Sequence, residues 1–168
     1  MAVANTNERP SPVDPAHFRN VLGRFPTGVT VVTAHDGVKP VGMAIGSFTS
    51  VSLDPPLVAF LPAKSSSSWA TIEKSGSFCV NVLADDQGPI CAAFASKAED
   101  KFAGITWEPA STGAPRLHGC VAWMDCSISA VHDGGDHWIV VGLVEEMDVD
   151  RDAGPLLFFK GQYGHFVS

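Results

Sequence analysis

The sequence predicts one domain of the mainly β class, with short antiparallel strands and a few attached helices. Its 168 residues, 45% of them hydrophobic, are enough for one buried core. Sixteen glycines and twelve prolines indicate many turns. Short apolar runs recur between these turns at nearly regular spacing. The pattern favours a β-barrel or a β-sandwich over a helical bundle.

The first residues differ from the rest of the chain. Residues 1–13 are polar and rich in proline, so we expect a disordered leader followed by one domain over residues 14–168. The leader lacks the basic head and apolar stretch of a signal peptide. No apolar run in the chain is long enough to span a bilayer. We therefore expect a soluble, cytoplasmic protein.

The domain is expected to begin with a helix over the segment DPAHFRNVLGRF. Asp14 is a typical N-cap, and Pro15 suits the first helical turn. Apolar residues then recur on one face of this helix: Phe18, Val21, Leu22 and Phe25. The next segment, GVTVVTAH, is rich in β-branched residues and predicts a strand that turns at Asp36-Gly37.

Residues 41–53, VGMAIGSFTSVSL, follow as an unusual strand region. They contain two glycines and several hydroxyl residues, which suit a strand beside a ligand better than a strand in the core. LVAFL, residues 57–61, predicts a short buried strand. KSSSSWATIEKSG then predicts a helix with a serine N-cap, Trp69 and Ile72 facing inward, and Gly76 as the C-cap.

The second half of the chain continues the β pattern. FCVNVL, residues 78–83, predicts another strand, and residues 86–104 contain at least one helix before a turn into ITWEP. A hairpin around residues 130–146 and the segment GPLLFFKGQYGHF complete the chain. Cys79 and Cys126 lie in apolar strand-like runs, which indicates buried, reduced thiols rather than disulfides.

The hairpin AVHDGGDHWIVVGLVEE carries a histidine on each side of its turn. With Gly134 and Gly135 in the turn, His132 pairs across from His137, and both rings cap an apolar face at one rim of the barrel. The two aspartates between them then point the other way or into the loop. Three interpretations stay open: an exposed hairpin end, a metal site that lacks a nearby third ligand, and donors that reach into a ligand pocket at the barrel mouth.

The strongest ligand signal from the residues alone is LVAFLPAKSSSSWATI. A strand ends there, a lysine and four serines follow, and a helix begins. Backbone N–H groups at a helix start, serine hydroxyls and the Lys64 ammonium together form a natural cradle for an anion. A serine-rich turn with one ordinary N-cap explains the same residues, and the spacing does not decide between the two.

Charge and motifs argue against several other functions. The formal net charge of −7 argues against nucleic acid or an anionic membrane as a partner. The chain contains no Gly-x-Gly-x-x-Gly after a strand, no Walker lysine motif, no Gly-x-Ser-x-Gly and no His-Glu-x-x-His. Its cysteines lack the spacing of metal ligands, so we expect no metal site.

Four segments, taken in order, resemble the flavin reductase family, the small reductase components of two-component flavin monooxygenases. They are FPTGVTVVT (residues 25–33), GMAIGSFTSVSLDPPLVAF (42–60), GDHWIVVGLV (135–144) and PLLFFKGQY (155–163). The resemblance runs from about Phe18 to Tyr163, which is nearly the whole chain. Within the family the chain looks closest to reductases that serve aromatic-ring hydroxylation, including that of steroid catabolism.

This resemblance implies an FMN-binding split β-barrel of Greek-key-like antiparallel strands, usually a homodimer with the flavin near the interface. It implies an NAD(P)H-dependent flavin reductase in which NADH, and less readily NADPH, reduces FMN or FAD by hydride transfer. The reduced flavin then leaves for a separate oxygenase component. The alternatives are a non-catalytic flavin carrier or sensor on the same barrel, and a lipocalin-like barrel without flavin.

The resemblance also implies which residues form the site. The GSFTSVS segment would lie along the isoalloxazine ring, with donors from Gly46, Ser47, Phe48, Thr49 and Ser50. The segments AKSSSSW and SKAEDKF would hold the ribityl phosphate, with Ala63, Lys64, Ser65, Ser66, Lys101 and Phe102. The nicotinamide would be bordered by Pro26, Thr27, His137 and Tyr163. His137 is the candidate catalytic residue, and its expected role is to position the carboxamide.

Two departures from the family pattern bear on these contacts. Met43 and Gly46 stand where the family often has hydroxyl residues, so backbone donors have to replace side-chain contacts there. Gln162 stands where the family often has the arginine of a Gly-Arg-Tyr ending. The loss of that cation favours NADH over NADPH.

Overall fold

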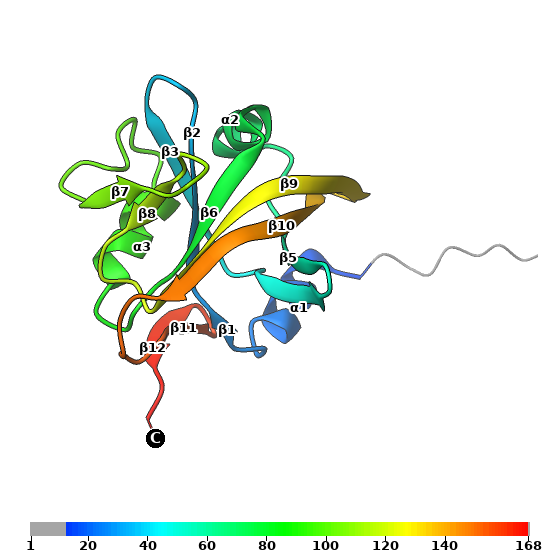
Figure 1. Ribbon diagram of the computed structural model, residues 1–168. Coiled ribbons are helices and arrows are strands. Elements are labelled where there is room, and N and C mark those ends of the chain that lie inside the picture. Colours follow the sequence, from blue (N-terminus) through cyan, green and yellow to red (C-terminus); the bar gives the residue numbers. More distant parts are fainter. Residues whose placement is uncertain (1–12, 168) are drawn as a thin grey trace, which may run out of the picture.

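The computed structural model describes residues 13–167, so nearly all of the predicted leader lies outside the described residues. Within the described part, three helices accompany twelve strands (Figure 1). The helices are α1 (Pro15–Leu22), α2 (Ser67–Ser75) and α3 (Gly88–Ala95). The strands are β1 (Thr27–Gly28), β2 (Thr30–His35), β3 (Pro40–Ile45), β4 (Thr49–Leu53), β5 (Pro56–Phe60), β6 (Ser77–Val82), β7 (Trp107–Pro109), β8 (Pro115–Leu117), β9 (Ala122–Gly134), β10 (His137–Val149), β11 (Leu156–Phe159) and β12 (Gln162–His165). The predicted mainly β class with a few helices is confirmed.

Seven of the strands form one antiparallel sheet in the order β3-β2-β6-β9-β10-β5-β4. Figure 1 shows this sheet strongly twisted, with the long β9–β10 hairpin crossing its middle. The smaller sheets are β1-β11-β12 and β7-β8. β3 and β4 are the two edges of the large sheet, and no pairing within residues 13–167 joins them. The structure therefore shows an antiparallel sheet that is open between these edges.

Side chains on both faces of the sheet are buried, as two neighbouring residues of β2 illustrate. Val32 belongs to a first core, and its neighbour Val31 belongs to a second core on the opposite face, because side chains alternate along a strand. α2 covers the first core, whose buried members include Phe60, Trp69, Ile72, Phe78 and Val80. α3 contributes to the second core, whose buried members include Leu83, Cys91, Phe94, Phe102 and Leu117.

The predicted helix caps are present. The Asp14 carboxylate accepts a hydrogen bond from the backbone N–H of His17 at 2.8 Å, at the start of α1. The Ser66 hydroxyl accepts one from the N–H of Trp69 at 3.2 Å, at the start of α2. Gly76 ends α2 with a φ of +75°, the left-handed conformation that glycine adopts without strain.

The apolar face of α1 does not enter either core. Its members Phe18, Val21 and Leu22 are between 49% and 55% exposed. Phe25, which was predicted on the same face, lies beyond the end of the helix and is 71% exposed. The Asp14 cap and the start of the helix are as predicted, but the helix ends at Leu22 and does not continue to Phe25. Its apolar side chains lie at the surface of the single chain. None of the described helices is long and apolar enough to cross a membrane.

The β9–β10 hairpin differs from its predicted register. The turn consists of Gly135 and Asp136, so His137 pairs with Gly134 and His132 pairs with Ile139. Gly135 has a φ of +86°, which glycine tolerates at this position. The prediction that His132 pairs with His137 is therefore wrong, because the turn lies one residue later in the chain than predicted.

The predicted orientation of the two histidines is also wrong, because β9 contains a bulge. Residue 129 is an extra residue between the pairs Ala130–Val141 and Ile128–Gly142, and it inverts the faces of β9 beyond it. The core face near the turn consequently carries Val131 and Trp138, while both histidines lie on the other face. Farther from the turn, Met124, Cys126 and Ile128 on β9 pack into the first core.

Candidate functional site

A cleft of about 750 Å³, named here the α1 cleft, lies where the end of α1 meets β1 and the connection from β3 to β4. It brings together two segments that are about twenty residues apart in the sequence. Its lining residues are Leu22, Phe25, Pro26, Thr27, Gly28, Thr30, Gly46, Ser47, Phe48, Thr49, Leu61 and Val82. Four of the five predicted ring contacts, Gly46 to Thr49, are thus in one cleft with Pro26 and Thr27 from the predicted nicotinamide side. Ser50, the fifth, is exposed on β4 and does not line the cleft.

The backbone at Gly46 approaches β1 closely. A β-carbon built on Gly46 would stand 3.2 Å from the Thr27 hydroxyl oxygen, which is tighter than ordinary van der Waals contact. Beside it, Ser47 is fixed by two hydrogen bonds to Leu61: its hydroxyl accepts from the Leu61 N–H at 3.1 Å and donates to the Leu61 carbonyl at 3.2 Å. These contacts hold the β3–β4 connection against the end of β5.

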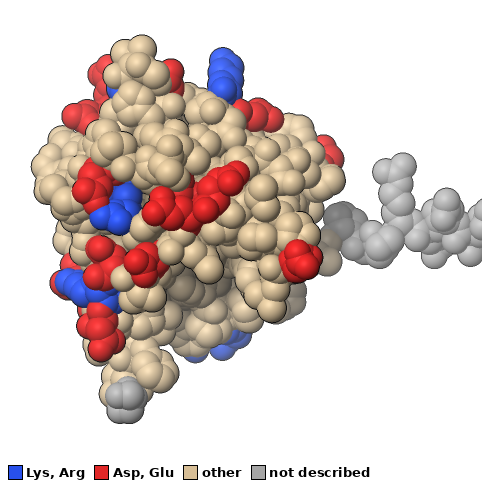
Figure 2. Space-filling view, in the orientation of Figure 1, with Lys and Arg blue, Asp and Glu red and all other residues tan. Residues whose placement is uncertain are grey.

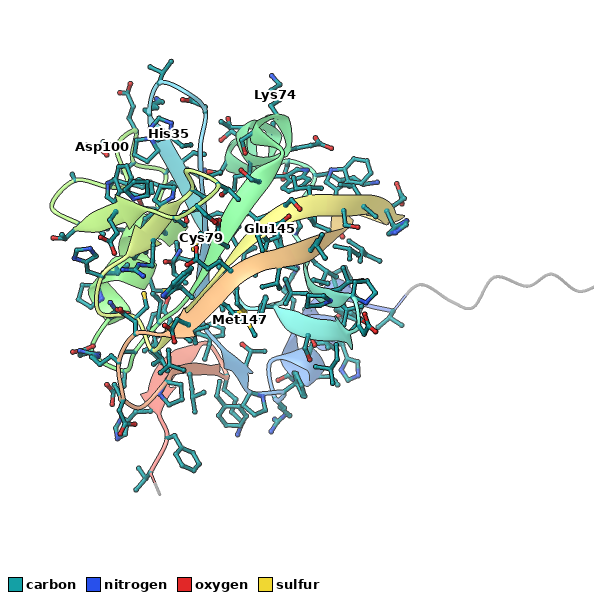
Figure 3. The ribbon with its side chains drawn as sticks, in the orientation of Figure 1. His35, Lys74, Cys79, Asp100, Glu145 and Met147 are labelled. Atoms are coloured by element: carbon teal, nitrogen blue, oxygen red, sulfur yellow. The ribbon has the colours of Figure 1, made fainter. Side chains whose placement is uncertain are left out.

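A second cleft of about 880 Å³, named here the α2 cleft, lies between the first turns of α2, the β2–β3 turn and the loop after α3. It is lined by Asp36, Lys39, Pro40, Val41, Gly42, Ser67, Ser68, Thr71, Lys97, Ala98, Glu99, Asp100, Lys101, Phe102 and Trp107. Lys101 and Phe102 are the predicted tail contacts in it. Figure 3 shows Asp100 and His35 at the same end of the molecule, which is the end that carries this cleft.

Lys101 is the most constrained cation of the α2 cleft. Its ammonium donates hydrogen bonds to the carbonyl oxygens of Phe94 at 3.0 Å and Gly42 at 3.5 Å, so it joins the end of α3 to β3. Burial lowers the pKa of this ammonium. Lys39 and Lys97 also line the cleft, and the sequence interpretation did not single them out. Lys97 could have been predicted from the sequence, because the segment SKAEDKF contains Lys97 as well as Lys101.

β3 connects the two clefts. Gly42 lines the α2 cleft and Gly46 lines the α1 cleft, and four residues of strand span about 13 Å. Between them Met43 contacts the start of α2, where the Ser66 hydroxyl lies 3.9 Å from the Met43 sulfur. One strand edge therefore runs from the predicted ring contacts to the predicted tail contacts.

The loop before α2 is fastened to the tip of the β9–β10 hairpin. Ala63 forms a bridge with His137, the Lys64 N–H donates to the Asp136 carbonyl at 3.0 Å, and the Trp138 N–H donates to the Pro62 carbonyl at 2.9 Å. The Lys64 ammonium forms an ion pair with Asp133 and lies 4.5 Å from the centre of the Trp138 ring. Lys64 therefore faces the hairpin and lines neither cleft.

The two serines after Lys64 have different environments. Ser66 is committed to capping α2, and its N–H donates to the Ala63 carbonyl at 3.0 Å. Ser65 is exposed beside it. The first N–H groups of an α-helix have no partner within the helix. At α2 the Ser66 hydroxyl satisfies one of them, so this end of α2 retains donors for an anion.

His137 and Tyr163 are not brought to the α1 cleft in the single chain. The His137 ring is 43% exposed and its Nδ1 lies 2.7 Å from the Asp136 carboxylate. This hydrogen bond holds the pKa of the Asp136 carboxyl below its usual value. The Tyr163 hydroxyl lies 3.2 Å from the Cys91 sulfur, and its strand is separated from Thr27 by β11. Within residues 13–167, no group of three potential metal-ligating side chains comes together.

Comparison with known proteins gives the family. The model of the flavin reductase like domain matches residues 22–166, a range that contains all four segments of the sequence resemblance. The chain belongs to the flavin reductase family. The resemblance derived from the motifs is thereby confirmed.

Relatives and solved structures agree with this assignment. This flavin reductase is 54% identical over 159 residues to a flavin reductase of Pseudomonas putida, with 94% of each chain covered. It is 54% identical over 151 residues to the reductase subunit HsaB of a flavin-dependent monooxygenase from Rhodococcus jostii, covering 90% of this chain and 77% of that one. Its fold matches an NADH:FAD oxidoreductase of Streptomyces globisporus, solved with NAD and FAD fragments, with a TM-score of 0.87, 37% identity, and coverage of 94% and 97%.

Proposed function

We propose that this flavin reductase transfers hydride from NADH to FMN or FAD and releases the reduced flavin to a separate monooxygenase component. The α1 cleft carries the proposal, because it joins the two motifs implied for the flavin ring and the nicotinamide. The subunit name of the Rhodococcus jostii relative supports an oxygenase partner. The name of the Streptomyces globisporus neighbour supports NADH as the reductant.

The residues of the α1 cleft fit a flavin ring. Its volume of about 750 Å³ lies within the range of about 300–1,000 Å³ typical of small-molecule sites. Phe25, Phe48 and Leu61 supply apolar walls for a flat aromatic ring. The Thr27 and Thr49 hydroxyls and the backbone N–H groups from Gly46 onward supply donors and acceptors for its polar edge.

The chain contributes to the reaction mainly by orientation and electrostatics. When bound, the flavin supplies the hydride acceptor and NADH supplies the hydride. The backbone from Gly46 to Ser50 would hold the ring edge on which negative charge develops, because donors fixed there before the reaction lower its barrier. Pro26 and Thr27 would hold the nicotinamide face close to the ring and exclude water.

His137 is proposed as the residue that positions the carboxamide of the nicotinamide. Its hydrogen bond to Asp136 and the bridge to Ala63 fix the ring at the hairpin tip. Tyr163 is proposed to border the same region from the β11–β12 hairpin. Because neither residue lines the α1 cleft of one chain, this part of the proposal requires the cleft to be completed by another surface.

The anionic tail of the flavin is proposed to extend along β3 toward α2. Lys101 and Phe102 line the α2 cleft next to the first turn of α2, which supports their predicted role. Ala63, Ser65 and Ser66 lie on the loop that leads into that turn. Lys64 is proposed to contribute its charge from the hairpin side, where Asp133 partly neutralises it.

A homodimer is the second part of the proposal. Large apolar side chains lie exposed around the α1 cleft, where Phe25 is 71% exposed, and on the β4 edge, where Leu53 is 96% exposed. Large apolar patches exposed on a protein surface mark interaction sites. A second copy over this surface would cover the α1 cleft and add residues to it. Sedimentation of the purified protein tests this part, with twice the chain mass as the expected result.

We propose that the large sheet closes into a split barrel, and a contact between its two ends supports this. Ser47 follows β3 at one edge, and its hydroxyl is hydrogen-bonded on both sides to Leu61, which follows β5 beside the other edge. Within residues 13–167 no strand pairing joins the two edges, and this side chain ties the connection between them to the end of β5. Such a seam is a suitable place for a ligand, because strand backbone is free there to bind it.

The cellular setting is proposed from surface and thiol chemistry. Figure 2 shows acidic side chains in several groups on one face of the molecule and few basic ones among them. With a net charge of −7, this supports small-molecule and protein partners over nucleic acid or membrane. All four cysteines are free and buried, which supports a reducing, cytoplasmic location.

The test is to mix protein, NADH and FMN without oxygen and follow the yellow absorption band of the flavin. Rapid loss of the band at catalytic protein concentration is expected. Binding of FMN without loss of the band would instead indicate a carrier or sensor, and no binding would contradict both. Repeating the assay with FAD and with NADPH measures the two preferences, and we expect NADH to be the better reductant.

A further inference from the structure

The ammonium group of Lys64 contacts two side chains of the β9–β10 hairpin. The Asp133 carboxylate forms an ion pair with it, and the centre of the Trp138 ring lies 4.5 Å from it. The Lys64 side chain is 32% exposed, and the Asp133 side chain is 70% exposed. The ion pair holds the pKa of the Asp133 carboxyl below its usual value, so Asp133 is an anion at neutral pH.

This ion pair stands beside the donors at the start of α2. Lys64 precedes the Ser66 cap by two residues, and the N–H groups of the first helical turn follow directly. An anion at this end of α2 would meet a lysine whose charge is already balanced by a carboxylate. A second carboxylate, Asp136, lies on the same hairpin tip and is 94% exposed.

We propose that Asp133 sets a low affinity of the α2 loop for the phosphate of the flavin, by competing with that phosphate for Lys64. This inference rests on the proposed function and deepens it. A reductase that supplies a separate oxygenase has to let its reduced flavin leave, and a phosphate held by an unopposed lysine at a helix start would leave slowly. Asp133 opposes such retention because it repels the phosphate and occupies a donor of Lys64.

The charge of Asp133 can be removed by a substitution that leaves the hydrogen bonds of the hairpin tip in place. The loop and the hairpin tip stay joined by backbone hydrogen bonds from Lys64 to Asp136 and from Trp138 to Pro62. Asp133 also accepts a hydrogen bond from the Gly135 N–H at 3.0 Å, and the amide oxygen of an asparagine can accept the same bond. Asp133→Asn therefore changes the charge beside Lys64 without loosening the turn.

The experiment compares FMN with riboflavin, which has the same ring and no phosphate. Dissociation constants are measured at low ionic strength for the wild type, Asp133→Asn, Asp133→Glu, Lys64→Met and the Lys64→Met/Asp133→Asn double variant. Asp133→Asn is expected to bind FMN about fivefold more tightly, with riboflavin binding unchanged. Asp133→Glu keeps the charge and is expected to behave as the wild type. The gain from Asp133→Asn should disappear in the Lys64→Met background and shrink at high salt.

Two results would overturn the inference. One is an unchanged or weaker affinity of Asp133→Asn for FMN. The other is an equal change for FMN and riboflavin, which would place the effect on the ring rather than on the phosphate. If the wild type binds neither flavin, the proposed function fails, and this inference fails with it. If the wild type binds both and only the expected ratio is missing, the proposed function stands and the role of Asp133 is refuted.

Discussion

Gly46 lies so close to Thr27 that a β-carbon built on it would stand 3.2 Å from the Thr27 hydroxyl oxygen. The two residues belong to motifs far apart in the chain, and both line the α1 cleft. The contact explains why a small residue at position 46 suits this protein. Any larger side chain there would have to enter the space between β1 and the β3–β4 connection.

The first prediction concerns that space. Gly46→Val should weaken FMN binding by about tenfold or more, because its methyl groups fill the part of the cleft proposed for the ring. Fluorescence titration of FMN measures the effect. Gly88→Ala is the control, since a β-carbon at Gly88 meets nothing within 4 Å and its affinity for FMN should not change. Wild-type affinity in Gly46→Val would remove the α1 cleft from the flavin site.

The second prediction concerns His137. His137→Ala should raise KM for NADH or lower kcat by about tenfold, because the carboxamide loses its positioning group. The melting temperature should stay nearly unchanged, since the His137 side chain is 43% exposed. His132→Ala is the matched control from the same hairpin, because His132 is exposed beside Ile139 and has no proposed role. Steady-state kinetics that match the wild type in His137→Ala would exclude this residue from the site.

The third prediction concerns a close contact in the first core. A β-carbon at Gly142 would lie 2.4 Å from the tip of the Phe78 ring and 3.3 Å from the Cys126 β-carbon. Gly142→Ala should therefore lower the free energy of unfolding by about 1–3 kcal/mol, because the ring has to shift in a packed core. Thermal unfolding should show a decrease of about 2–4 °C for each kcal/mol. Gly164→Ala, where nothing lies within 4 Å, should leave the melting temperature close to that of the wild type.

The fourth prediction concerns the buried thiols. Burial raises the pKa of Cys120 to about 12 and of Cys126 to about 12, and it also raises the pKa of Cys79. These thiols should not react with a thiolate-selective reagent in the folded protein, and they should react once denaturant unfolds it. Because their pKa values are raised in the folded state, the unfolded state loses its thiol protons first. The free energy of unfolding should therefore fall as the pH rises above about 8.5, which is the ordinary pKa of a cysteine thiol. Rapid labelling of these thiols in the native protein would contradict the burial.

The fifth prediction concerns the ion pair between Arg151 and Asp86, whose two hydrogen bonds are 2.6 and 3.0 Å long. The Arg151 guanidinium holds the pKa of the Asp86 carboxyl below its usual value. A lowered pKa in the folded state gives stability that is present above the ordinary carboxyl pKa and is lost as the pH falls through the lowered one. Asp86→Asn should therefore reduce the difference between the melting temperatures at about pH 7 and about pH 3. An unchanged difference would show that the pair adds nothing to stability.

Features that depend on neighbouring residues could be predicted from the sequence. The Ser66 cap, the inward Trp69 and Ile72 and the Gly76 end of α2 all follow from helical spacing and local hydrogen bonds. The grouping of Pro26, Thr27 and the Gly46–Thr49 segment followed from the family resemblance, because spacing alone gives no long-range contact.

Features that depend on one extra residue or on distant partners could not be predicted. The bulge at residue 129 inverts the faces of β9, and strict alternation therefore placed His132 and His137 on the core face. The exposure of the apolar side chains of α1 could not be predicted, because their spacing is that of a helix that packs on a core. The pairing of Lys64 with Asp133 joins residues 69 positions apart, and a serine-rich helix start gives no sign of it.

The most direct test of the account is a crystal structure of the protein with bound FMN. The isoalloxazine ring is expected in the α1 cleft, with its polar edge against the backbone that follows Gly46 and its phosphate toward the first turn of α2. A ring bound anywhere outside the α1 cleft would contradict the assignment of the site.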